Sequence, residues 1–493
     1  MRLFIFCFFL VISGALSAQN NNIDFGKFFI NQTLRVDFYH SGDAKTEFIS
    51  LDKIYKQGVW AGNPNQCIQP FELGSYKLLV MDTLTGQILY TKGYSTIFSE
   101  YQTTGPAIQG EKKTFHETAL VPFPKKPIRL IIQKRAKDNS LADIYSLVID
   151  PSDYHINTEK FIIEGNEVVN IINNGEPHHC VDLVILGEGY TLAEREKFKN
   201  DLKYFSDLLL GFEPYKTQKK LFNINGVFAP SEESGTDEPR QLIYRNTRFG
   251  SSFNTFDVDR YLTVEDNKAI HDAIACVPYD AILIMVNKDR YGGGGIFNFQ
   301  TVFAIGSDKK DYVFLHEFGH GFAGLADEYY TSQVAYQDIY ISGVEPLEAN
   351  ITALIDTANL KWKKLLSPGI KIPTDWGKDK FDSLNNTINS LQSLRASTIE
   401  QMQKAGKPKK EIDSKVNLID KQMGELYKKA DDFIFNHPLK DKVGVFEGAN
   451  YLSKGYYRPT INSMMLRFSP DQHSYGPVND QAIIKIIEYY TRK

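Results

Sequence analysis

A five-residue stretch, His316-Glu317-Phe318-Gly319-His320, constrains this chain more than any other feature. It has the form H-E-x-x-H and lies in a segment with a helical pattern. On a helix with about 3.6 residues per turn, residues four apart share a face, so the two histidines can bind one zinc ion. Glu317 then lies beside the open coordination position of the metal. A helix with two hydrogen-bonded histidines is the alternative unless further ligands follow.

A catalytic zinc site needs a third protein ligand, and the residues after His320 offer two. Gly324 is suited to end the helix and to turn the chain sharply, because glycine accepts a left-handed backbone at little cost. The turn can bring Asp327 or Glu328 back to the metal. We favour Asp327, because it follows Gly324 at the spacing that separates the glycine from the third ligand in metzincins. Both the glycine and the ligand lie one residue further from His320 than in the usual metzincin motif. Glu328 is the alternative third ligand.

Two further kinds of residue fit around such a site. Met464 and Met465 lie far along the chain, where metzincins place a methionine turn beneath the zinc. Ordinary core packing is the alternative for this pair. A tyrosine near the metal can stabilise the oxyanion or bind substrate, and we single out Tyr329, Tyr330 and Tyr475 for that role.

The N-terminus has the pattern of a secretory signal peptide over residues 1–18. Met1-Arg2 supplies a positive start, Leu3–Leu16 is almost wholly apolar, and small residues lead to a cleavage site after Ala18. The apolar run is too short for a stable anchor, and no other stretch approaches the length of a transmembrane helix. We therefore expect a secreted, periplasmic or cell-surface protein without a transmembrane anchor.

The chain has 493 residues, too many for one hydrophobic core, so we expect a multidomain protein. Residues 19–160 carry short alternating patterns between turn signals, which predict an antiparallel β-sandwich. Residues 165–493 alternate strand and helix patterns, which predict an α/β (α+β) catalytic domain. The net charge of -4 gives no reason to expect a nucleic-acid partner.

Individual elements follow from the same patterns. In the first region the strand patterns lie at 33–39, 76–81, 128–133 and 142–149. In the second region they lie at 181–186, 222–228, 281–286 and 301–305, with helical patterns at 191–210, 264–276, 312–324 and 480–490. The glycine run 292–295 lacks the Gly-Lys-Ser/Thr of a phosphate loop, so we expect a flexible rim above the cleft there.

Residues 379–435 differ from the rest of the chain. Two helical patterns with apolar faces are separated by Gly406-Lys407-Pro408, and the segment is rich in lysine. An antiparallel helical hairpin inserted into the catalytic domain fits this pattern. Its lysine-rich faces suit solvated scaffolding, and an arm that contacts a partner is the alternative.

The string from His316 to Tyr329, H-E-x-G-H-x-x-x-G-L-x-D-E-Y, resembles the signature of the secreted bacterial IgA-peptidase family of zinc metallopeptidases. Ala323 and Ser463 depart from residues common in that family, and neither is a proposed ligand. Similar segments also occur at 181–190, 234–237, 446–449 and 457–459. The resemblance covers residues 181–493, and the preceding β-domain is similar to the N-terminal module of the family.

The resemblance and the ligand set together predict a secreted zinc endopeptidase with a protein or glycoprotein substrate. Zinc would activate a water for attack, and Glu317 would take its proton as general base. Two other functions stay open on the sequence. One is a zinc hydrolase acting on a non-protein amide, and the other is a non-catalytic surface binding protein with a vestigial zincin domain.

Overall fold

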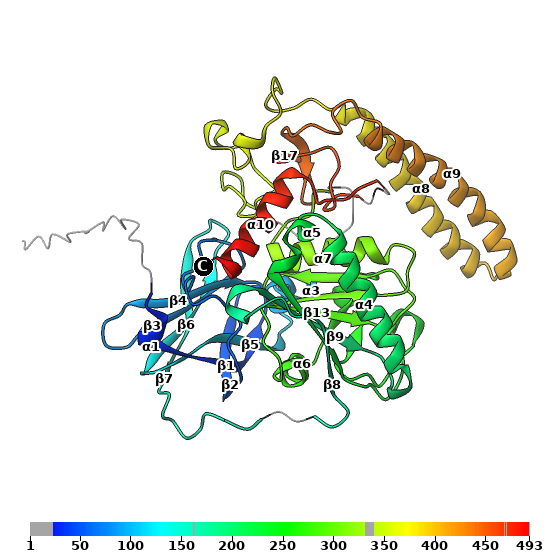
Figure 1. The fold of residues 1–493 in the computed structure, drawn as a ribbon. Coiled ribbons are helices and arrows are strands. Elements are labelled where there is room, and N and C mark those ends of the chain that lie inside the picture. The colour runs from blue at the N-terminus through cyan, green and yellow to red at the C-terminus, as the bar shows by residue number, and fades with distance from the viewer. Residues whose placement is uncertain (1–22, 161–162, 331–339, 468, 470, 493) are drawn as a thin grey trace, which may run out of the picture.

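The computed structural model describes residues 23–160, 163–330, 340–467, 469 and 471–492 (Figure 1). The signal peptide predicted over residues 1–18 lies outside these ranges. A sheet-rich N-terminal region is followed by a mixed α/β region and by a pair of long helices. None of the described helices has both the length and the apolar character needed to cross a bilayer.

Two antiparallel sheets make up the N-terminal region. One has the order β2-β1-β5, with β1 (Phe29–Gly42), β2 (Glu47–Lys56) and β5 (Lys113–Pro124). The other has the order β4-β3-β6-β7, with β3 (Tyr76–Asp82), β4 (Ile88–Tyr94), β6 (Ile128–Arg135) and β7 (Leu141–Ile149). Short helices α1 (Phe25–Phe28), α2 (Ile97–Tyr101) and α3 (Gly105–Ile108) accompany them. The four predicted strands are confirmed, and β2, β4 and β5 are additional.

Alternate residues of both sheets point into one shared core. Val36 of β1, Val80 of β3, Val121 of β5 and Leu130 of β6 are almost completely buried in it. Because strand side chains alternate between the two faces, this pattern leaves the opposite faces to polar residues. Burial of the inner faces is what holds the two sheets against each other.

A six-stranded mixed sheet forms the centre of the following region, in the order β14-β15-β13-β9-β10-β8. Its central strands are parallel, and both edge strands run antiparallel to their neighbours. The strands are β8 (Glu167–Ile172), β9 (Val181–Glu188), β10 (Phe222–Phe228), β13 (Ala281–Val286), β14 (Gly293–Ile296) and β15 (Gln300–Ala304). The predicted strands at 181–186, 222–228, 281–286 and 301–305 are confirmed.

Helices cover this sheet on both faces. Leu183 and Ile185 of β9 pack on the side that carries α4 (Arg195–Gly211), α7 (Lys310–Ala323) and α10 (Pro477–Thr491). Val184 and Leu186 of the same strand pack on the side of α6 (Asn267–Ile274). A short helix α5 (Tyr215–Gln218) follows α4, and β11 (Ser251–Ser252) pairs with β12 (Thr263–Val264) beside the sheet. Both faces of β9 are therefore buried, as its nearly continuous apolar run indicates.

The long helices α8 (Lys378–Lys404) and α9 (Lys409–Phe435) pack along each other and extend away from the rest of the chain (Figure 1). Arg395 on α8 lies 2.7 Å from a carboxylate oxygen of Asp420 on α9. The base of the pair is fixed by an apolar cluster that includes Trp376, Phe381 and Ile434. The hairpin β16 (Phe446–Ala449) and β17 (Leu452–Arg458) follows and leads back towards α10.

Candidate metal centre

Helix α7 carries the H-E-x-x-H segment and ends where the sequence predicts. Gly324 follows its last residue in a left-handed conformation, with a φ of 59°. The backbone N–H of Gly324 donates to the carbonyl of His320, and that of Leu325 donates to the carbonyl of Gly319. This helix end reverses the chain, as glycine commonly allows at this position. Asp327 is thereby brought back over the last turn of the helix.

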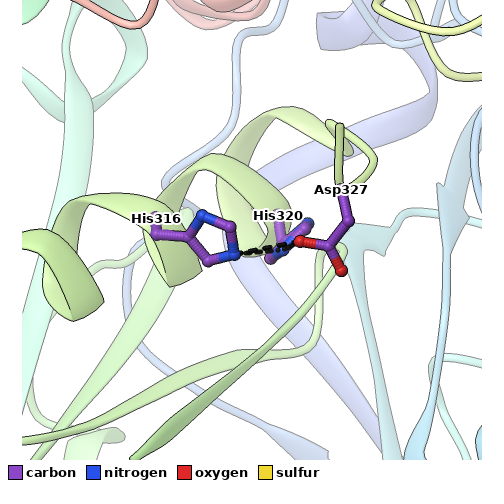
Figure 2. A group of neighbouring side chains, drawn as sticks. All are labelled: His316, His320 and Asp327. Atoms are coloured by element: carbon purple, nitrogen blue, oxygen red, sulfur yellow. Dashed lines mark hydrogen bonds and ion pairs between the residues drawn. The ribbon is translucent and has the colours of Figure 1, made fainter. Parts of the chain in front are cut away.

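His316, His320 and Asp327 form a compact group of three potential ligands (Figure 2). The Nε2 atoms of the two histidines are 3.2 Å apart. Asp327 Oδ1 lies 3.0 Å from Nε2 of His316 and 3.2 Å from Nε2 of His320. All three side chains are mostly or completely enclosed by protein. Two imidazoles and one carboxylate at this spacing match the donor set of a catalytic metal site.

The Nδ1 atoms of both histidines are held by hydrogen bonds, so the Nε2 atoms face the centre of this group. His316 Nδ1 lies 3.0 Å from the carbonyl oxygen of Met464, and His320 Nδ1 lies 2.6 Å from that of Leu325. Because a carbonyl only accepts, each Nδ1 must carry a proton, so a ring in its neutral form turns a lone pair inward from Nε2. Asp327 Oδ1 is buried and has no hydrogen-bond donor among the described residues. Three acceptors thus converge on one point, an arrangement that suits a cation.

The electrostatics of the group agree with this geometry. Burial by itself lowers the pKa of His320, but the charges of Asp327 and Glu317 outweigh it and raise the pKa to about 9. Burial raises the pKa of Asp327, and the two imidazoles outweigh that effect and hold the pKa well below its usual range. The surroundings of His320 therefore favour positive charge at this point, from a proton or from a metal ion.

Glu317 lines a large cavity of about 1290 Å³, together with the three potential ligands. Strand β14 passes close to it. A Cβ atom on Gly293 would lie 2.8 Å from Glu317 Cγ, and one on Gly295 would lie 2.9 Å from His320 Cβ. Glycine is thus required for the close approach of β14 to α7. Gly292–Gly295 line the cavity, where the sequence predicts a rim, and residues 293–296 form an edge strand paired with β15.

The methionine pair lies directly beneath the helix. Met464 and Met465 are fully buried, and the carbonyl of Met464 is the acceptor for His316. A Cβ atom on Gly319 would lie 2.7 Å from Met465 Sδ, so the thioether packs against the backbone of α7. The backbone N–H of Glu328 donates to the carbonyl of Met465 at 2.8 Å. These contacts join the chain after the helix to the methionine turn.

Glu328 belongs to a different network from the ligand group. It is fully buried and accepts hydrogen bonds from Asn350 at 3.0 Å, from Asn479 at 2.8 Å and from Ser463 at 2.7 Å. Burial raises the pKa of its carboxyl. The network ties together three distant parts of the chain behind Asp327. Neither asparagine was singled out from the sequence, because no local sequence pattern identifies residues whose hydrogen-bond partner is far away in the chain.

The three tyrosines singled out from the sequence take different positions. The ring of Tyr329 stacks on His316, with centroids 6.1 Å apart, and it lines the large cavity. Tyr330 donates a hydrogen bond to Asp382 at the base of α8. Tyr475 is fully buried and donates to the carbonyl of Leu315 within the core. The prediction that Tyr475 contacts the oxyanion or the substrate is therefore wrong, since its hydroxyl is used for packing behind α7.

Two residues beside the ligand group were missed by sequence reasoning. Tyr451, after β16, donates a hydrogen bond to Asp327 Oδ2, and its hydroxyl lies 3.3 Å from that of Tyr329. Arg260 lines the same cavity; burial lowers the pKa of its guanidinium, and Tyr329 and other nearby acidic groups outweigh that effect. No spacing rule connects either residue to the H-E-x-x-H helix, because both approach it from distant loops.

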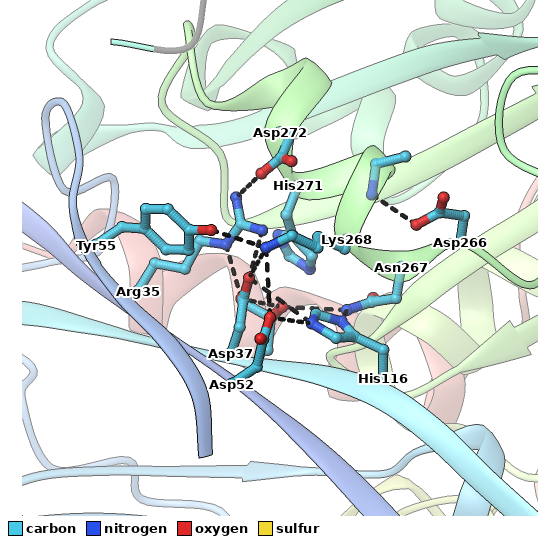
Figure 3. Close-up of polar contacts among 12 residues, drawn as sticks. Arg35, Asp37, Asp52, Tyr55, His116, Asp266, Asn267, Lys268, His271 and Asp272 are labelled. Carbon is cyan, nitrogen blue, oxygen red and sulfur yellow. Dashed lines mark hydrogen bonds and ion pairs between the residues drawn. The ribbon is translucent and has the colours of Figure 1, made fainter. Parts of the chain in front are cut away.

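A second group of potential ligands, Asp37, Asp52 and His116, lies between the N-terminal sheets and α6 (Figure 3). Arg35 donates to both carboxylate oxygens of Asp37, at 2.8 and 2.6 Å. Lys268 of α6 approaches Asp37 at 3.5 Å and Asp52 at 3.4 Å. Cationic side chains thus already neutralise these carboxylates, so the group is an ion-pair network that joins the two regions and not a second metal site.

The cleft and the helix with its convergent potential ligands are features of metal-dependent peptidases. Comparison with known families agrees with that class. A family model described as IgA Peptidase M64 matches residues 169–487, and one described as Peptidase M64 N-terminus matches residues 24–146. The chain belongs to the M64 peptidase family, and it is a hydrolase that acts on peptide bonds. A search of curated proteins gives no match to this chain.

Proposed function

We propose that the chain is a secreted zinc-dependent endopeptidase. His316, His320 and Asp327 would hold the zinc ion, and Glu317 would act as general base. The observation that carries this proposal is the convergence of two imidazole lone pairs and one buried carboxylate oxygen on a single point. The M64 family match supports a metallopeptidase, and the apolar segment after Met1 supports export to the periplasm, the cell surface or the medium.

The same proposal extends to the organisation of the chain. Residues 19–160 would form a β-sandwich, and residues 165–493 a metzincin-like peptidase domain with residues 379–435 as an inserted hairpin. The placement of Met465 under α7 and of Asp327 after the glycine turn supports this assignment. The two helices extend away from the rest of the chain (Figure 1), while Tyr427, Asp431 and Phe435 near the end of α9 line the large cavity.

A zinc ion bound at this position would supply Lewis acidity to a water and to the scissile carbonyl. Glu317 lies at the cavity beside the ligands, so its carboxylate can accept the proton of the attacking water and pass it to the leaving amine. A C–O bond forms as the C–N bond of the peptide breaks. Tyr329 and Arg260 line the same cavity and can donate hydrogen bonds to the developing oxyanion.

The size of the cavity favours a polymeric substrate over a small amide. Its volume of about 1290 Å³ exceeds the range of roughly 300–1,000 Å³ typical of pockets for small molecules. The edge strand β14 borders it and offers backbone groups to an extended chain. Protein or glycoprotein chains are therefore the substrates that we propose, and nothing in the cavity identifies immunoglobulin among them.

The decisive test compares Glu317→Gln with the unaltered protein. We expect the variant to retain one zinc ion per chain, measured by elemental mass spectrometry, and to lose digestion of casein and of a glycoprotein panel by about a hundredfold or more. Glu400→Gln, on the exposed face of α8, is the matched control and should leave both readouts unchanged. Full activity in Glu317→Gln would refute the mechanism, and zinc binding without any hydrolysis by the unaltered protein would favour a binding protein.

A further inference from the structure

A second cavity, of about 340 Å³, lies between the N-terminal sheets and the α/β region. Lys92 and Tyr94 of β4 line it from one side, together with Gln57 after β2. Asp280 before β13 and Tyr490 of α10 line it from the other side. It has no lining residue in common with the cavity at the ligand group, so it is a separate site.

Polar groups on the N-terminal side of this cavity lack partners. Gln57 Nε2 and the hydroxyl of Tyr94 are buried, and within the described ranges neither has a hydrogen-bond partner. The ammonium group of Lys92 likewise makes no hydrogen bond or ion pair with any described residue. Unpaired buried donors are unfavourable, and the ammonium group of Lys92, a half-buried residue, has no counter-charge in contact with it among the described residues. An occupant with hydrogen-bond acceptors would satisfy all three.

The nearest carboxylate does not fill this role. Asp280 accepts a hydrogen bond from the backbone N–H of Asp182 at 2.9 Å, and the contact directs its carboxylate towards β9. Burial lowers the pKa of Lys92, and the charge of Asp280 opposes that effect without offsetting it. The lysine therefore still lacks an anionic partner within hydrogen-bond distance.

Aromatic side chains form part of the remaining walls of the cavity. Trp60, Tyr90 and Tyr489 line it and are at most 7 % exposed, and the rings of Trp60 and Tyr90 meet edge to face at 6.0 Å. Aromatic walls of this kind favour a flat apolar body. A volume of about 340 Å³ lies within the usual range for small-molecule sites.

We propose that this cavity binds a small aromatic carboxylate, whose anionic group accepts hydrogen bonds from Lys92 and its unpartnered neighbours and whose ring packs between the aromatic walls. The ligand would contact both β4 and the loop before β13, and so would bridge the two regions of the chain. This site is independent of the peptidase assignment, because no residue of the H-E-x-x-H helix up to His320 lines it.

Isothermal titration calorimetry of the full-length chain with phenylacetate tests the proposal. Phenethylamine has the same ring with the opposite charge, and 2-phenylethanol has the ring without charge. We expect saturable one-to-one binding of phenylacetate, with about tenfold or greater weakening for the two analogues, because only the carboxylate makes charge-assisted hydrogen bonds. Phenylacetate should also slow acetylation of Lys92 by acetic anhydride, followed by peptide mass spectrometry.

Two variants locate the binding to this cavity. Lys92→Met keeps the length of the side chain and should weaken phenylacetate binding by about ten- to a hundredfold. Lys53→Met, at an exposed lysine of β2 outside the cavity, is the matched control and should bind as the unaltered protein does. Tyr94→Phe removes one unpartnered hydroxyl and should weaken binding several-fold, which keeps the test decisive if Lys92→Met misfolds.

Two results would overturn the proposal. One is the absence of saturable phenylacetate binding and of Lys92 protection in the unaltered protein, which would mean that water alone fills the cavity. The other is equal affinity for phenylacetate in Tyr94→Phe and in a correctly folded Lys92→Met, which would place the binding elsewhere.

Discussion

Tyr451 donates a hydrogen bond to Asp327 Oδ2, while Asp327 Oδ1 faces the two histidine nitrogens. The two residues are 124 positions apart in the chain. The bond fixes the carboxylate with one oxygen directed at the proposed metal position and the other directed away. Tyr451 is thus a positioning residue, of the kind that commonly orients a metal ligand from behind.

Tyr451→Phe tests this relationship. Loss of the hydroxyl frees Asp327 to rotate, and we expect zinc affinity to fall by about ten- to a hundredfold, measured by competition with a chromogenic chelator. Tyr456→Phe removes a hydroxyl on the following strand β17, from a residue that does not line the cavity, and should leave the affinity unchanged. Equal affinities for the two variants would show that Tyr451 does not position the ligand.

Asp327→Asn and Glu328→Gln separate the two acidic residues that follow Gly324. Asp327→Asn should abolish stoichiometric zinc binding, because the amide is a far weaker ligand than the carboxylate. Glu328→Gln should keep zinc and lower the free energy of unfolding by about 1–3 kcal/mol, because both asparagines donate to Oε1 and an amide N–H₂ in place of Oε2 cannot accept the hydrogen bond from Ser463. Zinc content and urea denaturation distinguish the two; the reverse pattern would make Glu328 the ligand.

The parts of the site that are local in sequence could be predicted from it. The two histidines follow from helical spacing, and Gly324 places Asp327 within reach of them. The contacts of Tyr451 and Arg260 could not be predicted, because they depend on how distant loops return to one helix. Tyr475 was misassigned for the same reason: the sequence does not tell which side of α7 its side chain packs on.

The strands of the fold were likewise predicted only in part. Strands such as β9 and β13, with continuous apolar runs, were predicted within one or two residues of their bounds. Strand β2 was missed because only one of its residues, Tyr55, is buried, which weakens the alternation of apolar and polar positions. Strand β14 was missed because its glycines lack β-forming side chains; they are needed for the approach to Glu317, a contact that only the folded chain reveals.

Gly319→Ala should disturb the packing beneath the ligand group. The added methyl would lie 2.7 Å from Met465 Sδ and 2.9 Å from a ring carbon of Tyr475, and both side chains are fully buried. We expect the free energy of unfolding to fall by about 1–3 kcal/mol. Gly424→Ala, in the exposed middle of α9 with no atom within 4 Å of the new methyl, should instead stabilise by about 0.5–1 kcal/mol. Urea denaturation measures both, and a neutral Gly319→Ala would contradict the close packing.

Stability should also depend on pH through His40 of the N-terminal core. Burial lowers the pKa of this imidazole, but Glu117 at 3.2 Å and Glu47 at 3.6 Å outweigh burial and raise the pKa to about 9. A raised pKa in the folded state contributes stability that is fully present below the unfolded value, near pH 6.5, and lost as the pH rises through about 9. Because one pKa unit corresponds to about 1.4 kcal/mol, we expect a loss of roughly 3 kcal/mol over that interval.

Urea denaturation from pH 6 to pH 9.5, with a chelator present throughout to remove any effect of metal binding, measures this loss. The comparison with His40→Gln isolates the imidazole, since the variant lacks the titrating group and retains Glu47 and Glu117. Its stability is lower at pH 6 and should fall less with rising pH, because only the contribution of His40 is removed, so the two curves converge near pH 9.5. Parallel curves for the two proteins would show that His40 is not protonated in the folded chain.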